Sequence, residues 1–322
     1  MEEVSYFFSS SASQGFEQNI YLREFEYLIT LIDPDKIVYT NQEYPEKYLN
    51  FLESFTQVKA KFSNNKNIAL NWNYYNSGTN NQFESKINFY QYLKKNDIYN
   101  SFQIITEPKD IDSEFLYKRE FGYSGKGIFK YPKDSKKIIH LLQSNERLIK
   151  ERELLRIKDF SALIYNNEIQ QIYENIIDDS LGYKGSVFSD EDILSNKQLE
   201  EYQTFIKNLI SEKSLNDKTY SIDSFLYKSD NVLKLFHACE INMRRSMGYI
   251  AHKLKGLYFE NIPFFVFRLY VTKNVKNYIK QRVYFNGKVI RISPDTNMFQ
   301  IFLFSVDNRD EFNRLETNLI NR

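Results

Sequence analysis

The chain has 322 residues, of which 42% are hydrophobic and 26% charged, a composition typical of a soluble globular protein with two or three compact units. A formal net charge of +1 gives no basic excess for nucleic acid, so we expect no nucleic-acid partner. The single cysteine, Cys239, excludes a disulfide within the chain and fits a reducing cytosol. No apolar run approaches the ~20 residues that span a bilayer, and the acidic N-terminus lacks a secretory signal, so we expect a cytoplasmic location without membrane contact.

The first part of the chain alternates short strands with helical patterns. Residues 35–40 and 67–72 are predicted to be strands, and apolar residues recur at helical spacing over residues 45–55. We therefore expect a small α/β unit over residues 1–85. An amphipathic helical pattern follows over residues 84–99.

Antiparallel hairpins carry most of the polar motifs in the middle of the chain. Residues 114–131 indicate a strand, a glycine loop and a second strand, and a hairpin turn is predicted at Asn166-Asn167. The i, i+3, i+4 apolar spacing over residues 190–214 predicts a long surface helix. Two further strands are expected to meet at a turn over residues 229–231.

The last third of the chain is predicted to add a helix, strands and a terminal helix. Residues 262–271 indicate a buried strand, and the Asn286-Gly287 pair predicts a hairpin turn. The whole order indicates a mixed α+β fold. We divide the chain into an N-terminal domain over 1–85, a lobe with the glycine loop over 86–149, and a lobe with a C-terminal extension over 150–322.

The glycine loop lies in the stretch "KREFGYSGKGI". Glycines at 122, 125 and 127 would let the backbone approach an anion closely, and Lys118 and Lys126 could offset phosphate charge. The spacing matches neither a Walker A loop nor a dinucleotide fingerprint that opens a helix. A simple mobile β-turn explains the glycines equally well.

The stretch "FHACEINMRRSMG" places several polar groups directly after an apolar run. Glu240 and Asn242 are two residues apart on a predicted strand, so their side chains point to one face, and a hairpin would bring Asp223 beside it. Two carboxylates and an amide oxygen form a hard oxygen site suited to Mg²⁺. Arg244 extends the same face and could meet an anion bidentately. The alternative is a polar strand edge that faces solvent.

Two other groups have weaker functional interpretations. His237 and Cys239 flank Ala238 and are predicted to face away from Glu240, as a packed pair rather than metal ligands. The loop over residues 182–186 could contact a phosphate or substrate, or could be a simple turn.

These pieces follow one order: a lysine, the glycine loop, an acidic crossover, an aspartate, then Glu-x-Asn-x-Arg. In this order the sequence resembles the ATP-grasp superfamily, which includes D-alanine–D-alanine ligase, glutathione synthetase and biotin carboxylase. The matching stretches are "LYKREFGYSGKGI", "LIKERELLRIKDFSALIY", "SIDSFLY" and "CEINMRRSMG". The resemblance covers about half of the chain and implies two α+β lobes that clamp ATP, preceded by the small α/β domain.

The resemblance also implies roles for individual residues. As catalytic residues, Lys118 would contact the ATP phosphates, and Arg244 would lie near the transferred phosphate or the substrate carboxylate. The implied nucleotide contacts are Lys86, Lys118, Gly122, Ser124, Gly125, Gly127, Glu151, Arg152, Leu154 and Asp159. Glu151 matches the acidic hinge residue beside the adenine, and Asp159 matches the position that holds the ribose. The implied metal ligands are Asp223, Glu240 and Asn242, for Mg²⁺ with Mn²⁺ as an alternative.

One departure from the family pattern concerns an arginine that many of these ligases carry two residues before the aspartate. Ser221 stands at that position here. The candidates for its replacement are Arg152, Arg156, Lys184 and Arg245.

The implied activity is that of an ATP-dependent carboxylate–amine ligase, which converts a carboxylate into an acyl phosphate and joins it to an amine, releasing ADP and phosphate. Its substrates would be small-molecule or peptide acids and amines, and a homodimer is left open. The alternatives are an ATP-grasp phosphotransferase and a catalytically inactive ATP-binding regulatory protein.

Overall fold

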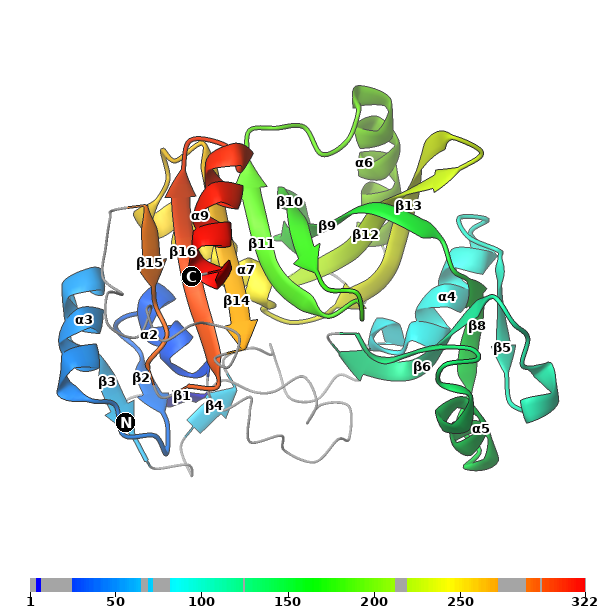
Figure 1. Ribbon diagram of the computed structural model, residues 1–322, viewed down its shortest axis with the longest axis horizontal. Helices are drawn as coiled ribbons and strands as arrows, with labels where there is room; N and C mark the ends of the chain where they lie inside the picture. Colours follow the sequence, from blue (N-terminus) through cyan, green and yellow to red (C-terminus); the bar gives the residue numbers. More distant parts are fainter. Residues whose placement is uncertain are drawn as a thin grey trace. The chain divides into compact units, whose positions relative to one another are not determined.

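The computed structural model describes residues 4–6, 25–64, 69–71, 82–123, 125–211, 219–271, 288–295 and 297–321. Two features expected from the sequence, Ser124 of the glycine loop and the Asn286-Gly287 turn, lie outside the described residues. The chain forms two compact units (Figure 1), each assembled from separate segments. Unit 1 draws on Met1–Ser77, Lys184–Ile193 and Arg244–Arg322, and unit 2 on Gly78–Tyr183 and Leu194–Met243. The three-segment division expected from the sequence stays a prediction.

Unit 1 contains a parallel sheet in the order β3-β2-β1-β4. Its strands are β1 (Val4–Tyr6), β2 (Ile37–Tyr39), β3 (Lys61–Ser63) and β4 (Ala69–Asn71), and its helices are α2 (Tyr27–Ile32) and α3 (Glu46–Thr56). Strands β2 and β4 and helix α3 confirm the α/β pattern predicted from the first part of the sequence. Tyr48 and Leu52, one helical turn apart on α3, are both buried. The Tyr48 hydroxyl donates to the carbonyl oxygen of Ile292 at 2.8 Å, which ties α3 to the C-terminal part of the same unit.

Unit 1 also contains four neighbouring antiparallel strands in the order β11-β14-β16-β15. Its strands are β11 (Tyr183–Ser189), β14 (Phe264–Val271), β15 (Val289–Arg291) and β16 (Phe299–Val306), accompanied by helices α7 (Met247–Tyr258) and α9 (Arg309–Asn321). Phe265 and Phe267 on β14 are fully buried, which confirms the predicted buried strand. The β-branched and aromatic residues of β14 favour this extended, packed state.

Unit 2 contains four neighbouring strands of an antiparallel sheet in the order β13-β12-β9-β10. Its strands are β9 (Leu155–Tyr165), β10 (Glu168–Ile177), β12 (Tyr220–Ser229) and β13 (Val232–Asn242). Both hairpin turns have central residues at positive φ, namely Asn166 (51°), Asn167 (60°), Asp230 (51°) and Asn231 (61°). Asn and Asp tolerate this conformation better than other side chains, so the two predicted turns form where the sequence supplies them.

Helix α6 (Asn196–Ile210) packs on one face of this sheet. The rings of Phe160 on β9 and Tyr202 on α6 lie 5.3 Å apart. The helix is shorter than the predicted span over residues 190–214, because its start is fixed by a capping box. The Ser195 side chain accepts from the Gln198 backbone N–H, and the Gln198 side chain accepts from the Ser195 backbone N–H.

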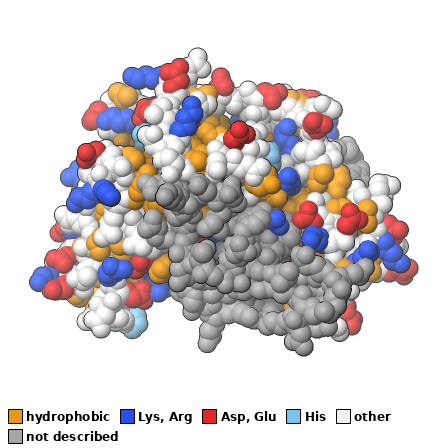
Figure 2. Space-filling model, turned by 180° about the vertical axis from the view of Figure 1, so that it is seen from behind, with side chains coloured by type: hydrophobic (Ala, Val, Ile, Leu, Met, Phe, Trp, Pro, Cys, Tyr) orange, Lys and Arg blue, Asp and Glu red, His pale blue; other side chains and the backbone are white. Residues whose placement is uncertain are grey.

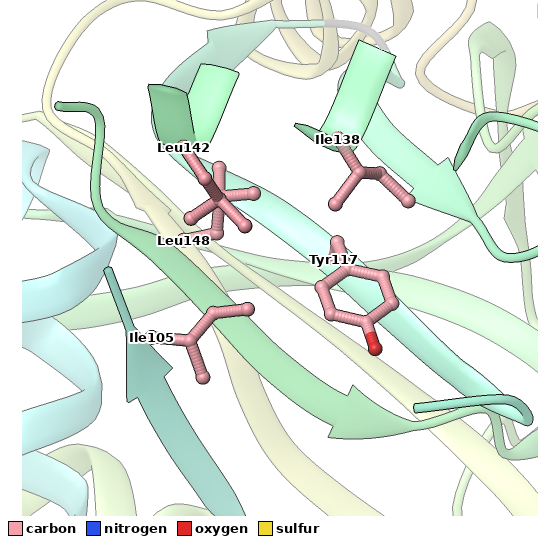
Figure 3. Close-up of a cluster of buried hydrophobic side chains, with 5 residues drawn as sticks. All are labelled: Ile105, Tyr117, Ile138, Leu142 and Leu148. Carbon is pink, nitrogen blue, oxygen red and sulfur yellow. The ribbon is translucent and has the colours of Figure 1, made fainter. Parts of the chain in front are cut away.

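The second sheet of unit 2 has the order β5-β8-β6-β7. Its strands are β5 (Phe102–Ile105), β6 (Phe115–Tyr123), β7 (Lys126–Lys130) and β8 (Leu148–Arg152). Its helices are α4 (Lys86–Lys95) and α5 (Ser135–Gln143), with short 3₁₀ turns η3 (Gln82–Glu84) and η4 (Pro108–Asp110). A compact core joins α5 to this sheet (Figure 3) and consists of Ile105, Tyr117, Ile138, Leu142 and Leu148.

The described surface is chemically mixed. On the face seen in Figure 2, Lys and Arg side chains are interspersed with Asp and Glu side chains, in keeping with the net charge of +1. No helix within the described ranges combines the length and the apolar content needed to cross a membrane. The elements make a mixed α+β protein, as the order of the sequence patterns predicts.

Candidate functional site

The acidic residues of unit 2 meet on one face of the β12–β13 hairpin. Asp223 lies directly opposite Glu240, and Ser221 opposite Asn242. Residues directly opposite each other on antiparallel strands project to the same side of a sheet. The Asn242 Nδ2 donates to Asp223 Oδ2 at 2.9 Å. The structure therefore brings together the three residues that the sequence analysis selected as metal ligands.

Lys86 joins this acidic face to the glycine-loop strand. Its Nζ lies 2.9 Å from Glu240 Oε1 and donates to the carbonyl oxygen of Gly122 at 3.2 Å. The ammonium is placed by its position as the first residue of α4, whose N-cap Ser85 accepts from the Asn88 backbone N–H. The Lys86 side chain is only 8% exposed, so Glu240 has a desolvated cation at hydrogen-bond distance.

A second buried cluster links Lys118, Glu151 and Tyr90. Lys118 Nζ lies 2.5 Å from Glu151 Oε1 and donates to the Tyr90 hydroxyl at 2.9 Å. The Tyr90 hydroxyl in turn donates to Glu151 Oε2 at 2.8 Å. Burial, and then the Glu151 charge, raise the pKa of Tyr90 well above its usual value, so its proton stays in place. An ammonium has three N–H donors, so Lys118 keeps one donor beyond those used on Glu151 and Tyr90.

Gly125 of the glycine loop lies against the turn that follows β10. Its φ is +75°, and a Cβ at this position would stand 2.4 Å from the carbonyl oxygen of Ser180. That turn is closed by Asp178, whose Oδ1 accepts from the backbone N–H groups of Ser180 at 2.9 Å and Gly182 at 2.8 Å. Of residues 182–186, which the sequence left open as a phosphate-contacting loop or a simple turn, only Gly182 lies at this turn, and Tyr183 to Ser186 belong to strand β11 (Tyr183–Ser189).

The segment after β8 contains the residues assigned to the base and the ribose. Arg152 ends β8 and is exposed, and Leu154 precedes β9. Asp159, on β9, forms an ion pair with Arg156. Burial raises the pKa of the Asp159 carboxyl even though the Arg156 guanidinium opposes the rise. Arg156 also stacks over the ring of Phe225 at 4.0 Å, so this arginine is held by two partners.

Arg244 follows β13 in the segment that leads to α7, whose N-cap is Ser246. Its side chain is half-buried. Arg244 belongs to unit 1, whereas Asp223, Glu240 and Asn242 belong to unit 2. Its role in the site stays a prediction.

His237 and Cys239 lie two residues apart on β13. The His237 Nε2 lies 2.8 Å from Glu201 Oε1 on α6, and its ring lies 5.4 Å from that of Phe205. Cys239 is half-buried, and the loss of hydration around its sulfur raises the pKa of the thiol to about 12. His237 therefore packs against helix α6, and its expected packing with Cys239 stays a prediction.

Three residues in contact with the candidate site were missed by the sequence analysis. They are Tyr90, Ser161 and Asn175. Tyr90 is four residues after Lys86, a spacing that places both on one face of α4. Ser161 donates to Asp223 Oδ1 at 2.7 Å, and Asn175 Nδ2 donates to Ser161 Oγ at 2.6 Å. Helical spacing could have indicated Tyr90, but nothing local in the sequence marks Ser161 or Asn175.

The acidic face fits a hard divalent cation through its oxygen donors. Within the described residues there is no group of three or more His, Cys, Asp and Glu side chains arranged for a metal ion. The set here instead combines the carboxylates of Asp223 and Glu240 with the Asn242 amide. Because the Asn242 NH₂ group is engaged by Asp223, its carbonyl oxygen is the amide atom suited to a cation.

Comparisons with known proteins identify the fold. No family model and no curated protein matches the sequence. The chain is similar in structure to N5-carboxyaminoimidazole synthetase from Staphylococcus aureus complexed with ADP, with 13% identity, a TM-score of 0.57, and coverage of 99% of this chain and 98% of that one. It is similar to phosphoribosylamine–glycine ligase from Thermotoga maritima, with 11% identity, a TM-score of 0.55, and coverage of 99% and 96%.

A third similar structure is L-amino acid ligase from Bacillus licheniformis, with 8% identity, a TM-score of 0.59, and coverage of 99% and 97%. These three proteins have the ATP-grasp fold. The likeness extends over nearly the whole of each chain, so the α+β ATP-grasp fold expected from the motif order is confirmed.

Proposed function

We propose that this protein is an ATP-dependent ligase that activates a carboxylate as an acyl phosphate and joins it to an amine. The observation that carries the proposal is the Lys86 ammonium, 2.9 Å from Glu240 and 3.2 Å from the carbonyl oxygen of Gly122. That contact places an acidic, oxygen-rich hairpin face next to a glycine-loop strand. Anionic and cationic groups at hydrogen-bond distance suit a metal–triphosphate, which carries both kinds of charge.

The chemistry follows from charge. A carboxylate reacts with an amine only after it gains a good leaving group, which the γ-phosphoryl of ATP provides. Phosphoryl transfer depends on positioning and on neutralising the phosphate oxygens rather than on a nucleophilic side chain. Lys86 and the free donor of Lys118 are suited to contact those oxygens, and Arg244 is assigned to the transferred phosphate or the substrate carboxylate.

Asp223, Glu240 and Asn242 would hold the divalent cation. When bound, Mg²⁺ supplies a Lewis acid that neutralises developing charge on the phosphates. With Glu240 engaged as a ligand, the Lys86 ammonium would be able to contact a phosphate oxygen instead. Mn²⁺ prefers similar oxygen ligands and would serve as a replacement.

The remaining assignments concern the nucleotide. The glycine loop from Gly122 to Gly127 would fold over the phosphates, with Gly125 supported by the turn at Ser180. The backbone from Arg152 to Leu154 would offer hydrogen bonds to the base edge, next to the buried Glu151. Asp159 would accept from the ribose hydroxyls.

The test is a product assay with the purified full chain, Mg-ATP and pools of small acids and amines. We expect ADP and phosphate in equal amounts, released only when both an acid and an amine are present. ADP without equivalent phosphate would contradict the ligase and favour a phosphotransferase. Tight ATP binding without turnover across the screen would instead favour a regulatory nucleotide-binding protein.

A further inference from the structure

A directed chain of hydrogen bonds crosses the three strands next to Asp223. Asn175 Nδ2 on β10 donates to Ser161 Oγ on β9 at 2.6 Å, and Ser161 Oγ donates to Asp223 Oδ1 on β12 at 2.7 Å. From the other side, Asn242 Nδ2 on β13 donates to Asp223 Oδ2 at 2.9 Å. Both oxygens of the Asp223 carboxylate therefore accept a hydrogen bond from a neighbouring strand.

The direction of each bond in this chain is fixed by the groups that take part. An amide NH₂ can only donate, so Ser161 Oγ must accept from Asn175, and the single hydroxyl proton of Ser161 is then used on Asp223. Ser161 is 1% exposed, so water is not available to take over either bond. A buried hydroxyl without partners would cost free energy, and here it is satisfied by these two residues alone among the described hydrogen bonds.

Strand register sets this arrangement. Asp223 lies directly opposite Ser161 on β9 and opposite Glu240 on β13. Asn175 lies opposite Asp159, one pleat along from Ser161. Ser161 is thus directly across the sheet from the proposed ligand, and Asn175 can reach it diagonally.

We propose that Ser161 and Asn175 are positioning residues that hold the Asp223 carboxylate for the metal ion. The inference rests on the proposed function. A free aspartate carboxylate rotates broadly about its terminal torsion, whereas donors on both oxygens fix its plane. Each carboxylate oxygen has further lone pairs, so the hydrogen bonds leave Asp223 able to bind a cation. Losing such a supporting partner typically lowers metal affinity about 10- to 100-fold.

Ser224 provides a matched control on the same strand. It is also 1% exposed, and its Oγ donates to the His237 carbonyl oxygen at 2.6 Å and is hydrogen-bonded to the Tyr202 hydroxyl at 2.8 Å. As the next residue after Asp223 it projects to the opposite face, toward α6. The Ser224→Ala variant therefore removes a buried, doubly bonded hydroxyl without touching the acidic face.

The test measures Mn²⁺ binding to the full chain in the presence of ADP, by the electron paramagnetic resonance signal of free Mn²⁺. We expect Ser161→Ala to raise the Mn²⁺ dissociation constant about 10- to 100-fold. Ser161→Thr, which keeps a hydroxyl, should restore most of the affinity, and Ser224→Ala should bind Mn²⁺ as the unaltered chain does. Binding of ADP without metal should be the same in all variants.

A double variant separates positioning from direct contact. If Asn175 acts through Ser161, the Ser161→Ala/Asn175→Ala variant should bind Mn²⁺ no more weakly than Ser161→Ala alone. Equal Mn²⁺ affinity for Ser161→Ala and Ser224→Ala would overturn the inference while leaving the proposed function intact. So would fully additive losses in the double variant. An unaltered chain that binds neither ADP nor Mn²⁺ would overturn the proposed function and the inference together.

Discussion

Breaking the buried ion pair between Lys118 and Glu151 by removing one partner should cost far more stability than breaking an equally short pair at the surface. The Lys118 and Glu151 side chains are each 7% exposed and 2.5 Å apart. Lys109 and Glu107 are also 2.5 Å apart, but their side chains are 73% and 56% exposed. Because the N–O distance is the same in the two pairs, a difference in the stability lost on breaking each pair reports the effect of burial.

The Lys118→Met variant keeps the length of the side chain and removes its charge. It leaves a buried carboxylate whose remaining partner is the Tyr90 hydroxyl. Removing one partner of a buried pair costs about 3–5 kcal/mol, and the surviving Tyr90 bond argues for the lower end, about 3 kcal/mol. Lys109→Met should leave stability nearly unchanged, because exposed pairs are screened by water.

The assay is equilibrium unfolding in urea, followed by tryptophan fluorescence and circular dichroism. A double-mutant cycle adds Lys118→Met/Glu151→Gln, which removes the buried charge and should recover at least about 2 kcal/mol of the loss. The reasoning would be refuted if Lys118→Met destabilised the chain no more than Lys109→Met. It would also be refuted if the two buried substitutions were simply additive.

Three further predictions concern the backbone at Gly125, the thiol of Cys239 and the imidazole of His237. Gly125→Ala should lower the free energy of unfolding by about 1–3 kcal/mol and weaken ATP binding, because φ is +75° there and an added Cβ would meet backbone atoms. Gly256→Ala in a helix, where an added Cβ would meet nothing within 4 Å, should leave stability unchanged or raise it. Urea titrations and ATP calorimetry compare the two variants, and equal effects would contradict the close packing at Gly125. With the pKa of its thiol raised to about 12, Cys239 should react with iodoacetamide at pH 8 roughly 1,000-fold more slowly in the folded chain than in the unfolded chain. Similar rates in the two states would contradict the burial of the thiol. Burial lowers the pKa of His237 below 6.5, so the unfolded chain binds more protons and the free energy of unfolding should fall as the pH drops below about 6.5. In urea titrations at several pH values, His237→Asn should reduce this pH dependence. An unchanged pH dependence would contradict the buried environment of His237.

Much of the fold could be predicted because local sequence chemistry agrees with it. The hairpin turns contain Asn and Asp at the positions where φ is positive, and alternation marks the strands on either side. The face shared by Glu240 and Asn242 follows from a spacing of two residues on one strand. Counting back from the turn between β12 and β13 would pair Asp223 with Ala238, and the irregularity in β13 moves the pairing to Glu240 on the same face.

Side-chain partners could not be predicted where strand register decides them. Asp223 lies opposite Glu240, and Phe225 opposite Phe236, so β13 has His237 to Cys239 where β12 has only Ser224. Counting residues from the turn therefore does not give the cross-strand partners of His237 and Cys239.

The hydrogen-bond partners of Lys118 and Asp223 also depend on tertiary structure. Lys118 meets Glu151 because β6 lies beside β8, and it meets Tyr90 because α4 covers that point. Ser161 and Asn175 come to Asp223 through strands β9 and β10. No spacing in the sequence reports these contacts, because each joins residues that only the sheet order brings together.

The most direct measurement of the central claim is calorimetric titration of ATP, with and without Mg²⁺, into Glu240→Gln and Glu201→Gln. Glu201 is a matched control because its carboxylate meets β13 from the opposite face, at His237. A metal-bridged nucleotide between the lysines and the acidic hairpin predicts that Glu240→Gln loses at least about tenfold of the Mg²⁺-dependent gain in ATP affinity, while Glu201→Gln keeps it. Unchanged Mg²⁺-dependent ATP binding in Glu240→Gln would contradict the account.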